Sequence, residues 1–567
     1  MQIVSLPQLS HTTLSELQDG LQSGAFTSED LVRTYLKRIE EVNDRVHAVV
    51  EVNSSAVETA RALDEERRLH GHRGPWHGVP VLIKDSIATT DMENTSGSYA
   101  LSGATIDRDA SVVQRLRAAG AIVLGTTNLS QWGNARSSDA NNSYKSQSSN
   151  GWSATGGQTY GVYHVKQDPS GSSSGSAVAT SLGLALAAVG NETDGSIICP
   201  AGRSAVVGIK PTPGLTPRDL VILPKRIGTV GVMAQTVEDA AALLTVIAGA
   251  CPHDRRTEEI PFDEIPDYRS FCRRSALRGA RIGIPRNAFQ NNDGNVVDAV
   301  ELAALEETIS IMAKAGAVIV DPAEYPEYAT FFAKSPSMKA VYNNADWKAQ
   351  FEDYVARLTK NPQNIHTISD LVEFTKTCPA EEYPSRNIDG LLHIEKALSA
   401  DDPSVEAAFE QVRQWAMEGC IQGAVQRHQL DALILPSGVS TTVAAAACCP
   451  VINVPWGYYP KGTPLVWNGR GNLLLRHENT PFGLSFIGLP FTEHKLIAYS
   501  YAFEQLTRVR DRGKQYITPT TELDDVLDSS STNNTEWQDL PTQEKQIPGS
   551  NIRIHLHMTA SQDTVNV

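Results

Sequence analysis

The chain has 567 residues, of which 41% are hydrophobic and 20% charged, and these values exclude a disordered, collagen-like or coiled-coil protein. Its 49 basic and 65 acidic side chains give a net charge of −16, so partners such as nucleic acid or an anionic membrane surface are not expected. The seven cysteines include no C-x-x-C pair, which argues against a disulfide framework and against a thiolate zinc site.

The first 130 residues alternate between helix and strand patterns, and this alternation favours an α/β fold. Two amphipathic helices are expected over 9–46, and the second begins after Thr27, an N-cap residue with Asp30 three positions on. The other helices and strands of this part are predicted over 56–69, 79–85, 112–119 and 121–125.

The middle of the chain opens with a long polar segment, 130–174, rich in Ser, Asn, Gly and Gln. Such loops within a compact chain are places where functional residues are found. The apolar stretch 176–189 is predicted to form one helix that is buried on every side. Residues 322–430 are rich in helix patterns and are expected to form an inserted cap over the core. Further strands and helices are predicted over 281–285, 299–315, 317–320, 433–436, 451–455, 483–488 and 496–506.

The composition of the two ends of the chain bears on the cellular location of the protein and on the boundary of its domain. The N-terminus lacks a basic segment followed by an apolar one, so no secretory signal is expected. No apolar run reaches the length of a membrane span. The sequence therefore predicts a soluble, cytoplasmic protein with one domain over 1–517 and a polar, flexible tail over 518–567.

Three elements contain groups that could perform acyl transfer: Lys84 at the end of a predicted strand, the Gly/Ser run 170–176, and the polar turn 192–197. A serine needs a base to become a nucleophile, and a desolvated, neutral lysine can serve as that base. Glycines beside serines let several backbone N–H groups converge on one point and hold an oxyanion. The N-terminus of the helix expected from 176 would face the Gly/Ser run, favour negative charge there, and help to lower a nearby lysine pKa.

These residues resemble the amidase signature family. The similarity rests on the segment GVPVLIKD that contains Lys84, on the run GSSSGSA, and on the 24-residue step from Ser172 to Ser196. The stretches 128–132, 151–159 and 193–197 are most similar to the peptide amidase branch and its bacterial and fungal relatives. The resemblance is strong over 10–250 and weaker over 430–510. It implies the amidase signature fold, in which helices cover both faces of a central, mixed and twisted β-sheet.

The resemblance also assigns roles to individual residues. It implies that Ser196 is the nucleophile, that Ser172 is a bridging serine after a cis peptide bond, and that Lys84 is the base. Lys84 would take a proton from Ser172 while Ser172 takes one from Ser196, and Ser196 would attack the amide carbonyl to form an acyl-enzyme. No metal or organic cofactor is implied. The expected oxyanion hole consists of the backbone N–H groups of Thr193, Asp194, Gly195 and Ser196.

Two segments depart from the pattern of many family members. Asp194-Gly195-Ser196-Ile197-Ile198 stands where Gly-Gly-Ser-Ile-Arg is common, and the aspartate form suits the peptide amidase branch. Gly231 stands where a proline is expected, which leaves the substrate preference open.

Other polar residues near the motifs have simpler interpretations. Asp85 is expected to hold loop backbone, and Cys199 is expected to be a small buried hydrophobe. Three histidines form an H-x-H pattern without the spacing of a third ligand, so a solvated loop is favoured over a metal site: His70, His72 and His77. Three aromatic residues of the polar loop could line the acyl pocket or pin the loop: Trp132, Trp152 and Tyr160.

The favoured function is hydrolysis of a linear carboxamide, either a peptide amide or a small secondary-metabolite amide. One alternative is the glutaminase subunit of a tRNA amidotransferase, which shares the fold but needs partner subunits and a route for ammonia. The Thr193-Asp194-Gly195 form disfavours this alternative. A second alternative is an inactive scaffold, which should lack a member of the triad, whereas this chain has all three. The sequence leaves open the substrate, the cleavage of esters and the oligomeric state.

Overall fold

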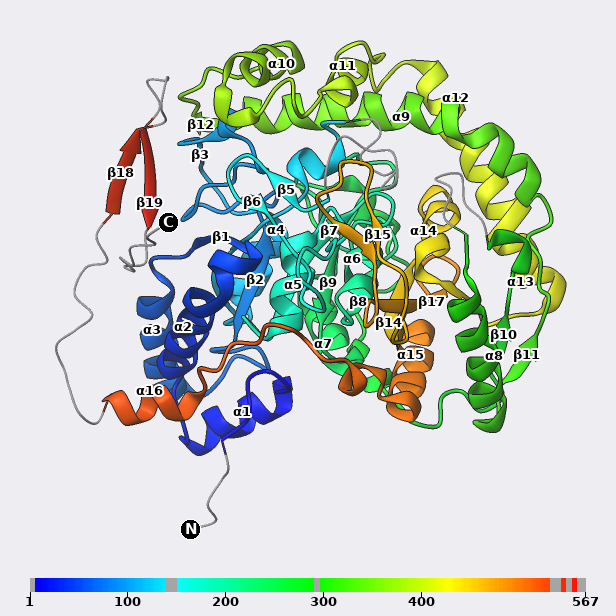
Figure 1. Cartoon of the computed structure of the whole chain (residues 1–567), viewed down its shortest axis with the longest axis horizontal. Coiled ribbons are helices and arrows are strands. Elements are labelled where there is room, and N and C mark those ends of the chain that lie inside the picture. The colour runs from blue at the N-terminus through cyan, green and yellow to red at the C-terminus, as the bar shows by residue number, and fades with distance from the viewer. Residues whose placement is uncertain (1–5, 138–149, 290–295, 531–541, 547–552, 558–567) are drawn as a thin grey trace.

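The computed structural model describes residues 6–137, 150–289, 296–530, 542–546 and 553–557. Within these residues an 11-stranded mixed sheet crosses the molecule in the order β1-β4-β2-β7-β9-β8-β14-β17-β13-β10-β11 (Figure 1). Its strands are β1 (Val49–Val52), β2 (Pro80–Lys84), β4 (Ile122–Thr127), β7 (Ala187–Glu192), β8 (Val207–Lys210), β9 (Thr229–Ala234), β10 (Arg281–Gly283), β11 (Val318–Val320), β13 (Ala432–Pro436), β14 (Val451–Tyr458) and β17 (Pro481–Ile487).

Helices pack on both faces of this sheet, so the predicted α/β fold class is confirmed. One face carries α5 (Ser174–Leu182), α6 (Ile198–Arg203) and α14 (Ser437–Ala446), and the other carries α4 (Ser111–Ala118), α7 (Val237–Ile247) and α15 (Glu493–Thr507). The central strands, apart from the last two residues of β14, are buried along their whole length because they are covered on both sides. The remaining larger helices lie at the two ends of the sheet: α1 (Leu14–Ser23), α2 (Ser28–Val46), α3 (Ala56–His70), α8 (Ala299–Lys314), α13 (Gln422–His428) and α16 (Leu523–Ser530).

Four helices run along one side of the molecule, at the top of Figure 1. They are α9 (Tyr328–Ala356), α10 (Ile368–Thr377), α11 (Asp389–Glu395) and α12 (Pro403–Ala416). They fall within 322–430, and α9 contacts the core through Trp132, whose ring packs edge-on against Trp347 and Phe351. That these residues form an inserted cap on a single domain over 1–517 stays a prediction.

Local signals placed the early helices correctly. The Thr27 side chain accepts a hydrogen bond from the Asp30 N–H (3.1 Å), and the Asp30 carboxylate accepts one from the Thr27 N–H (2.9 Å). This reciprocal capping box satisfies N–H groups that the first turn of α2 would otherwise leave without partners. The helix α3 ends at His70 and is capped by Gly71, where the expected glycine stop lies.

The prediction of one helix over 176–189 is wrong. The helix α5 ends at Leu182, Gly183 adopts a left-handed conformation (φ +62°), and residues from Ala187 onward form strand β7. Both elements are buried on every side, so the sequence is apolar throughout and shows no change of period at the junction.

The prediction of a flexible tail from 518 is wrong for residues 520–527. Two N–H groups at Thr520 and Thr521 donate to the Glu41 carboxylate, and α16 packs on α2 with Leu523 and Val526 buried. The cause is the fully buried Arg38 of α2, which takes Glu522 as its counter-charge at 3.0 Å. Much of the remaining predicted tail lies outside the described residues. No helix in the described ranges combines the length and apolar character of a membrane span.

Candidate active site

A cleft of about 590 Å³ opens beside the carboxyl ends of the parallel strands β2 and β7, a volume typical of small-molecule sites. Parallel pairing sets Ile83 beside Val189, which brings Lys84 next to the last residues of β7. The cleft is lined by the turn after β7, by α6, by the Gly/Ser run and by α9. The tertiary structure thus brings the three predicted polar elements together.

Lys84 lies at the end of β2 with no exposed surface. Its Nζ donates hydrogen bonds to the Ser172 hydroxyl at 2.7 Å, to Asn191 Oδ1 at 2.8 Å and to the Asn191 carbonyl at 3.3 Å. Burial lowers the pKa of Lys84 to about 7, although the negative charge of Glu192 acts in the opposite direction. A substantial fraction of this lysine is therefore a neutral amine near neutral pH.

Ser172 stands just before α5 and is 1% exposed. The peptide bond between Gly171 and Ser172 is cis, as the family resemblance implied. The Ser172 carbonyl accepts a hydrogen bond from the Ser130 N–H at 3.0 Å, which joins the Gly/Ser run to the turn after β4. Gly175 allows α5 to approach this turn, because a Cβ there would lie 2.6 Å from the Asn128 nitrogen.

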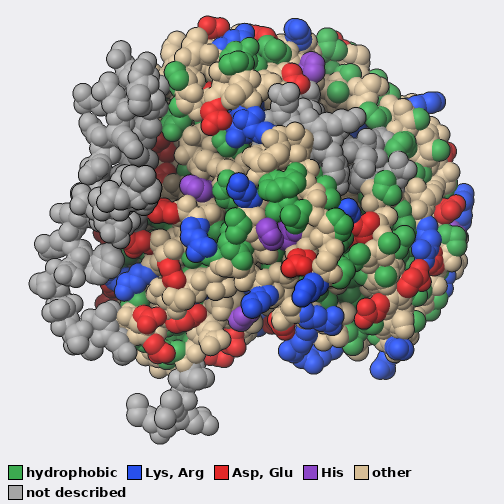
Figure 2. All heavy atoms as spheres, in the orientation of Figure 1, with side chains coloured by type: hydrophobic (Ala, Val, Ile, Leu, Met, Phe, Trp, Pro, Cys, Tyr) green, Lys and Arg blue, Asp and Glu red, His purple; other side chains and the backbone are tan. Residues whose placement is uncertain are grey.

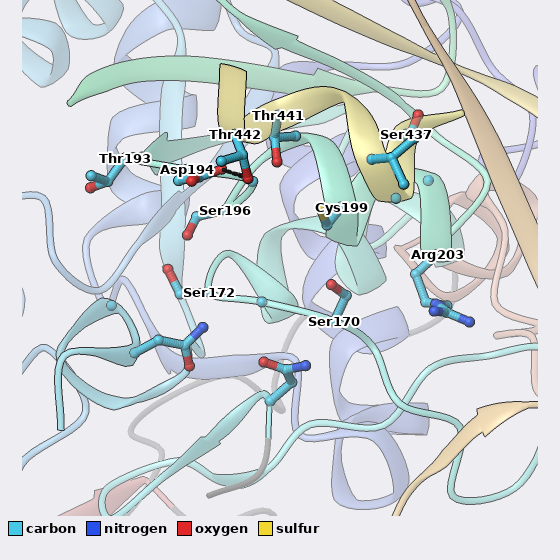
Figure 3. A pocket seen from close by; sticks show the side chains of 18 of the residues that line it. Ser170, Ser172, Thr193, Asp194, Ser196, Cys199, Arg203, Ser437, Thr441 and Thr442 are labelled. Atoms are coloured by element: carbon cyan, nitrogen blue, oxygen red, sulfur yellow. Dashed lines mark hydrogen bonds between the residues drawn. The ribbon is translucent and has the colours of Figure 1, made fainter. Parts of the chain in front are cut away.

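Ser196 ends the turn between β7 and α6 and is 8% exposed at the cleft surface. Its hydroxyl points toward Ser172 (Figure 3). The turn requires Gly195, whose φ of +86° is left-handed and whose Cβ would lie 2.9 Å from the Cys199 sulfur. The Ser196 carbonyl accepts a hydrogen bond from the Ser173 N–H at 3.0 Å, so the two serine-bearing segments are joined directly.

The carboxylate of Glu192 supports this turn from behind. It accepts hydrogen bonds from the N–H groups of Ile197 (2.6 Å) and Ile198 (2.9 Å), at the start of α6. Complete burial raises the pKa of Glu192, and the nearby Lys210 ammonium and these hydrogen bonds act against that rise. Glu192 therefore fixes the backbone that directly follows Ser196.

The four residues expected to form an oxyanion hole, Thr193, Asp194, Gly195 and Ser196, all line the cleft. The Asp194 carboxylate is held from two directions. Lys339 of α9 lies 3.3 Å from it, and the Thr442 hydroxyl of α14 lies 3.4 Å from it (Figure 3). These contacts tie the turn to helices that are distant in sequence.

Other predicted residues have mixed outcomes. Trp132 lines the cleft, whereas the Trp152 ring lies against the Arg386 guanidinium at 3.9 Å and does not line it, nor does Tyr160. The expectation for Asp85 is confirmed, because its carboxylate accepts hydrogen bonds from the N–H groups of Thr95 and Gly97.

The expectation that Cys199 is a small buried hydrophobe is wrong. It is partly exposed in the cleft, one helical turn after Gly195. His77, by contrast, is buried and not solvated, and its ring nitrogens make hydrogen bonds with backbone groups of Leu63 and Arg73.

The sequence reasoning missed Asn191 and Lys339, and it gave no role to Glu192, the first residue of the polar turn 192–197. Asn191 and Glu192 had a usable signal, because an Asn-Glu pair at the end of an otherwise apolar strand places polar groups in the core at a cost that function can explain. Lys339 had none, since it lies within a long helix with many charged residues and reaches the turn only through the tertiary fold.

Most of the chain matches a known protein family. The family model for amidases covers residues 30–497. The chain belongs to the amidase family. It is a hydrolase of amide C–N bonds.

Three relatives illustrate the range of this amidase family. A protein of Arthroderma benhamiae that carries an amidase name is 41% identical over 93% of this chain and 90% of its own length. The X-ray structure of the native peptide amidase from Stenotrophomonas maltophilia superposes with a TM-score of 0.77 at 35% identity, covering 90% of this chain and 99% of that one. A glutamyl-tRNA(Gln) amidotransferase subunit from a Synechococcus species is 28% identical over 88% of this chain and 98% of its own length.

Proposed function

We propose that this amidase hydrolyses linear carboxamides through an acyl-enzyme, with Ser196 as nucleophile, Ser172 as proton relay and Lys84 as base. The observation that carries the proposal is the 2.7 Å hydrogen bond between Lys84 and Ser172, beside the hydroxyl of Ser196 in the cleft. A buried lysine with a pKa near 7 can accept a proton under the conditions in which an exposed lysine cannot.

The reaction begins with the neutral amine of Lys84. Lys84 accepts the hydroxyl proton of Ser172, Ser172 accepts that of Ser196, and the Ser196 oxygen bonds to the amide carbon. The tetrahedral oxyanion receives hydrogen bonds from backbone N–H groups of the 193–196 turn. As the C–N bond breaks, the proton returns through Ser172 to the leaving nitrogen. Water then attacks the acyl-enzyme by the same proton path and releases the carboxylic acid and Ser196.

We favour a peptide bearing a C-terminal amide as the substrate class. The similarity to a peptide amidase along almost its whole length supports this choice. The cleft is also far larger than a simple amide requires, and its walls combine the aromatic rings of Trp132 and Trp347 with the charged side chains of Arg203 and Asp298. Such walls suit a substrate that presents both apolar side chains and polar backbone groups.

The test is hydrolysis by the purified protein of a panel containing peptide amides, small primary amides, anilides and esters. We expect release of ammonia from peptide amides and no release by the Ser196→Ala variant. Activity confined to small primary amides would contradict the substrate class, and activity of the Ser196→Ala variant would contradict the nucleophile.

The alternative of a glutaminase subunit is favoured by one observation, the similarity to an amidotransferase subunit over nearly all of that subunit's length. Against it, the chain carries a net charge of −16, and acidic and basic side chains are intermixed on the face shown in Figure 2. We therefore propose a free-standing cytoplasmic enzyme that needs no nucleic acid, membrane or second subunit. Glutamine hydrolysis that appears only with added partner subunits and tRNA would overturn this proposal.

A further inference from the structure

The acceptors around the Lys84 ammonium group contain a residue with no role in the mechanism above. Of the three atoms that accept hydrogen bonds from Lys84 Nζ, one belongs to Ser172 and two belong to Asn191. Asn191 is 5% exposed and lies at the end of β7, beside the turn that carries Ser196.

Asn191 supplies as many acceptors as the neutral amine of Lys84 has N–H groups. A protonated lysine has three N–H donors, whereas a neutral one has two donors and one lone pair. Lys84 can accept the Ser172 proton only when this lone pair faces the Ser172 oxygen. That orientation requires acceptors for the two N–H groups in other directions, and Asn191 supplies both through Oδ1 and its carbonyl.

Asn191 is itself held in one orientation. Its Nδ2 donates a hydrogen bond to the Ser86 hydroxyl at 2.7 Å, which leaves Oδ1 as the atom that faces Lys84. The Asn191 carbonyl also accepts a hydrogen bond from the Ser173 hydroxyl at 3.2 Å, and antiparallel pairing of Asn191 with Val230 of β9 fixes the backbone. The side chain therefore has little freedom to follow Lys84 if the lysine turns.

We propose that Asn191 is a positioning residue that turns the lone pair of Lys84 toward Ser172. This inference rests on the proposed function, since it assumes that Lys84 is the base. Three charged groups lie near Lys84 and Asn191. The Glu192 carboxylate acts on Lys84, Lys210 faces Glu192, and the Asp85 carboxylate is turned toward Thr95.

Two substitutions at Asn191 separate orientation from simple disruption. Asn191→Asp keeps the shape but adds a negative charge beside Lys84, so it should stabilise the ammonium form. Asn191→Ala removes the Oδ1 acceptor without adding charge. The readout is the rate at which a fluorophosphonate labels Ser196 between about pH 5 and pH 10, which needs no knowledge of the natural amide.

For Asn191→Asp we expect the rising acid limb of the labelling profile to move to higher pH by about one to three units, as a new charge pair at short distance requires. For Asn191→Ala we expect the plateau rate to fall about tenfold or more without an upward shift of the limb, because the proton acceptor is less well aligned. Ser86→Ala should lower the plateau by a smaller factor, since it releases only the amide of Asn191.

A matched control introduces the same carboxylate away from the site. Asn43→Asp on α2, where Asn43 contacts the backbone of Ala48 and Val49, should leave the profile unchanged. The inference would be overturned if Asn191→Asp and Asn191→Ala lost the same fraction of the plateau rate and the acid limb of Asn191→Asp did not move. A wild-type plateau rate in Asn191→Ala would also overturn it. If thermal melting shows that Asn191→Asp is not folded, the plateau labelling rates of Asn191→Ala and Ser86→Ala test the inference instead.

This design keeps the two proposals apart. Failure of the wild-type protein to react at Ser196 would contradict the proposed function itself. Normal labelling of the wild type, together with wild-type profiles in the Asn191 variants, would contradict only the role of Asn191.

Discussion

The burial of Lys84 makes a quantitative prediction about the pH dependence of the amidase. An exposed lysine has a pKa of 10.5, whereas burial lowers the pKa of Lys84 to about 7. Because the proposed mechanism needs the neutral amine of Lys84, kcat/KM should rise with pH and level off just above pH 7. Two units below that pKa, about 1% of the lysine is neutral, so kcat/KM near pH 5 should be about a hundredfold below its plateau.

The same burial affects stability, and the sign follows from proton uptake. Between about pH 7 and 10.5 the native lysine is neutral while the unfolded lysine is protonated, so unfolding takes up a proton and stability rises with pH. At about 1.36 kcal/mol per pKa unit, the shift costs the native state about 5 kcal/mol at pH 7 and below. Lys84→Met removes this cost, and it should therefore raise the melting temperature at pH 7 while abolishing hydrolysis.

The assay measures kcat/KM on a peptide amide across this pH range, with melting temperatures recorded at each pH as a control for folding. Lys84→Met and Ser196→Ala serve as blanks. A rate that is still at its plateau near pH 5, or that continues to rise tenfold per unit above pH 9, would refute the reasoning. So would a Lys84→Met variant that keeps one tenth of the wild-type rate.

Three further changes test the turn. Ser196→Ala should abolish hydrolysis and fluorophosphonate labelling with little change in melting temperature, and peptide mapping of the wild type that finds the label on another serine would contradict the assignment. Gly195→Ala should lower kcat about a hundredfold or more, because the left-handed turn and the nearby Cys199 sulfur leave no room for a Cβ. A folded Gly195→Ala variant with the wild-type kcat would disprove this. Lys339→Ala should lower kcat/KM about tenfold by releasing Asp194, measured against Lys334→Ala as a control on the same helix.

The sequence predicted the fold class, the early helices and several core strands because the signals involved are local. The capping box at Thr27 and the apolar strand before Lys84 depend on neighbours a few residues away. Local signals failed where burial is uniform, as in 176–189, since a helix and a strand that are both enclosed have the same apolar composition. They also failed at 520–527, where a distant buried arginine holds the chain.

The sequence also named Lys84, Ser172 and Ser196, because their spacing matches a family pattern. It could not show that Lys84 is fully buried or that Asn191 holds it, since both depend on parallel pairing between strands more than 100 residues apart in the chain. The lowered pKa of Lys84 has the same origin, because desolvation results from all the atoms that surround the amine and not from any single segment of the chain. The sequence therefore determined which groups could react, and only the tertiary structure decided their environment and alignment.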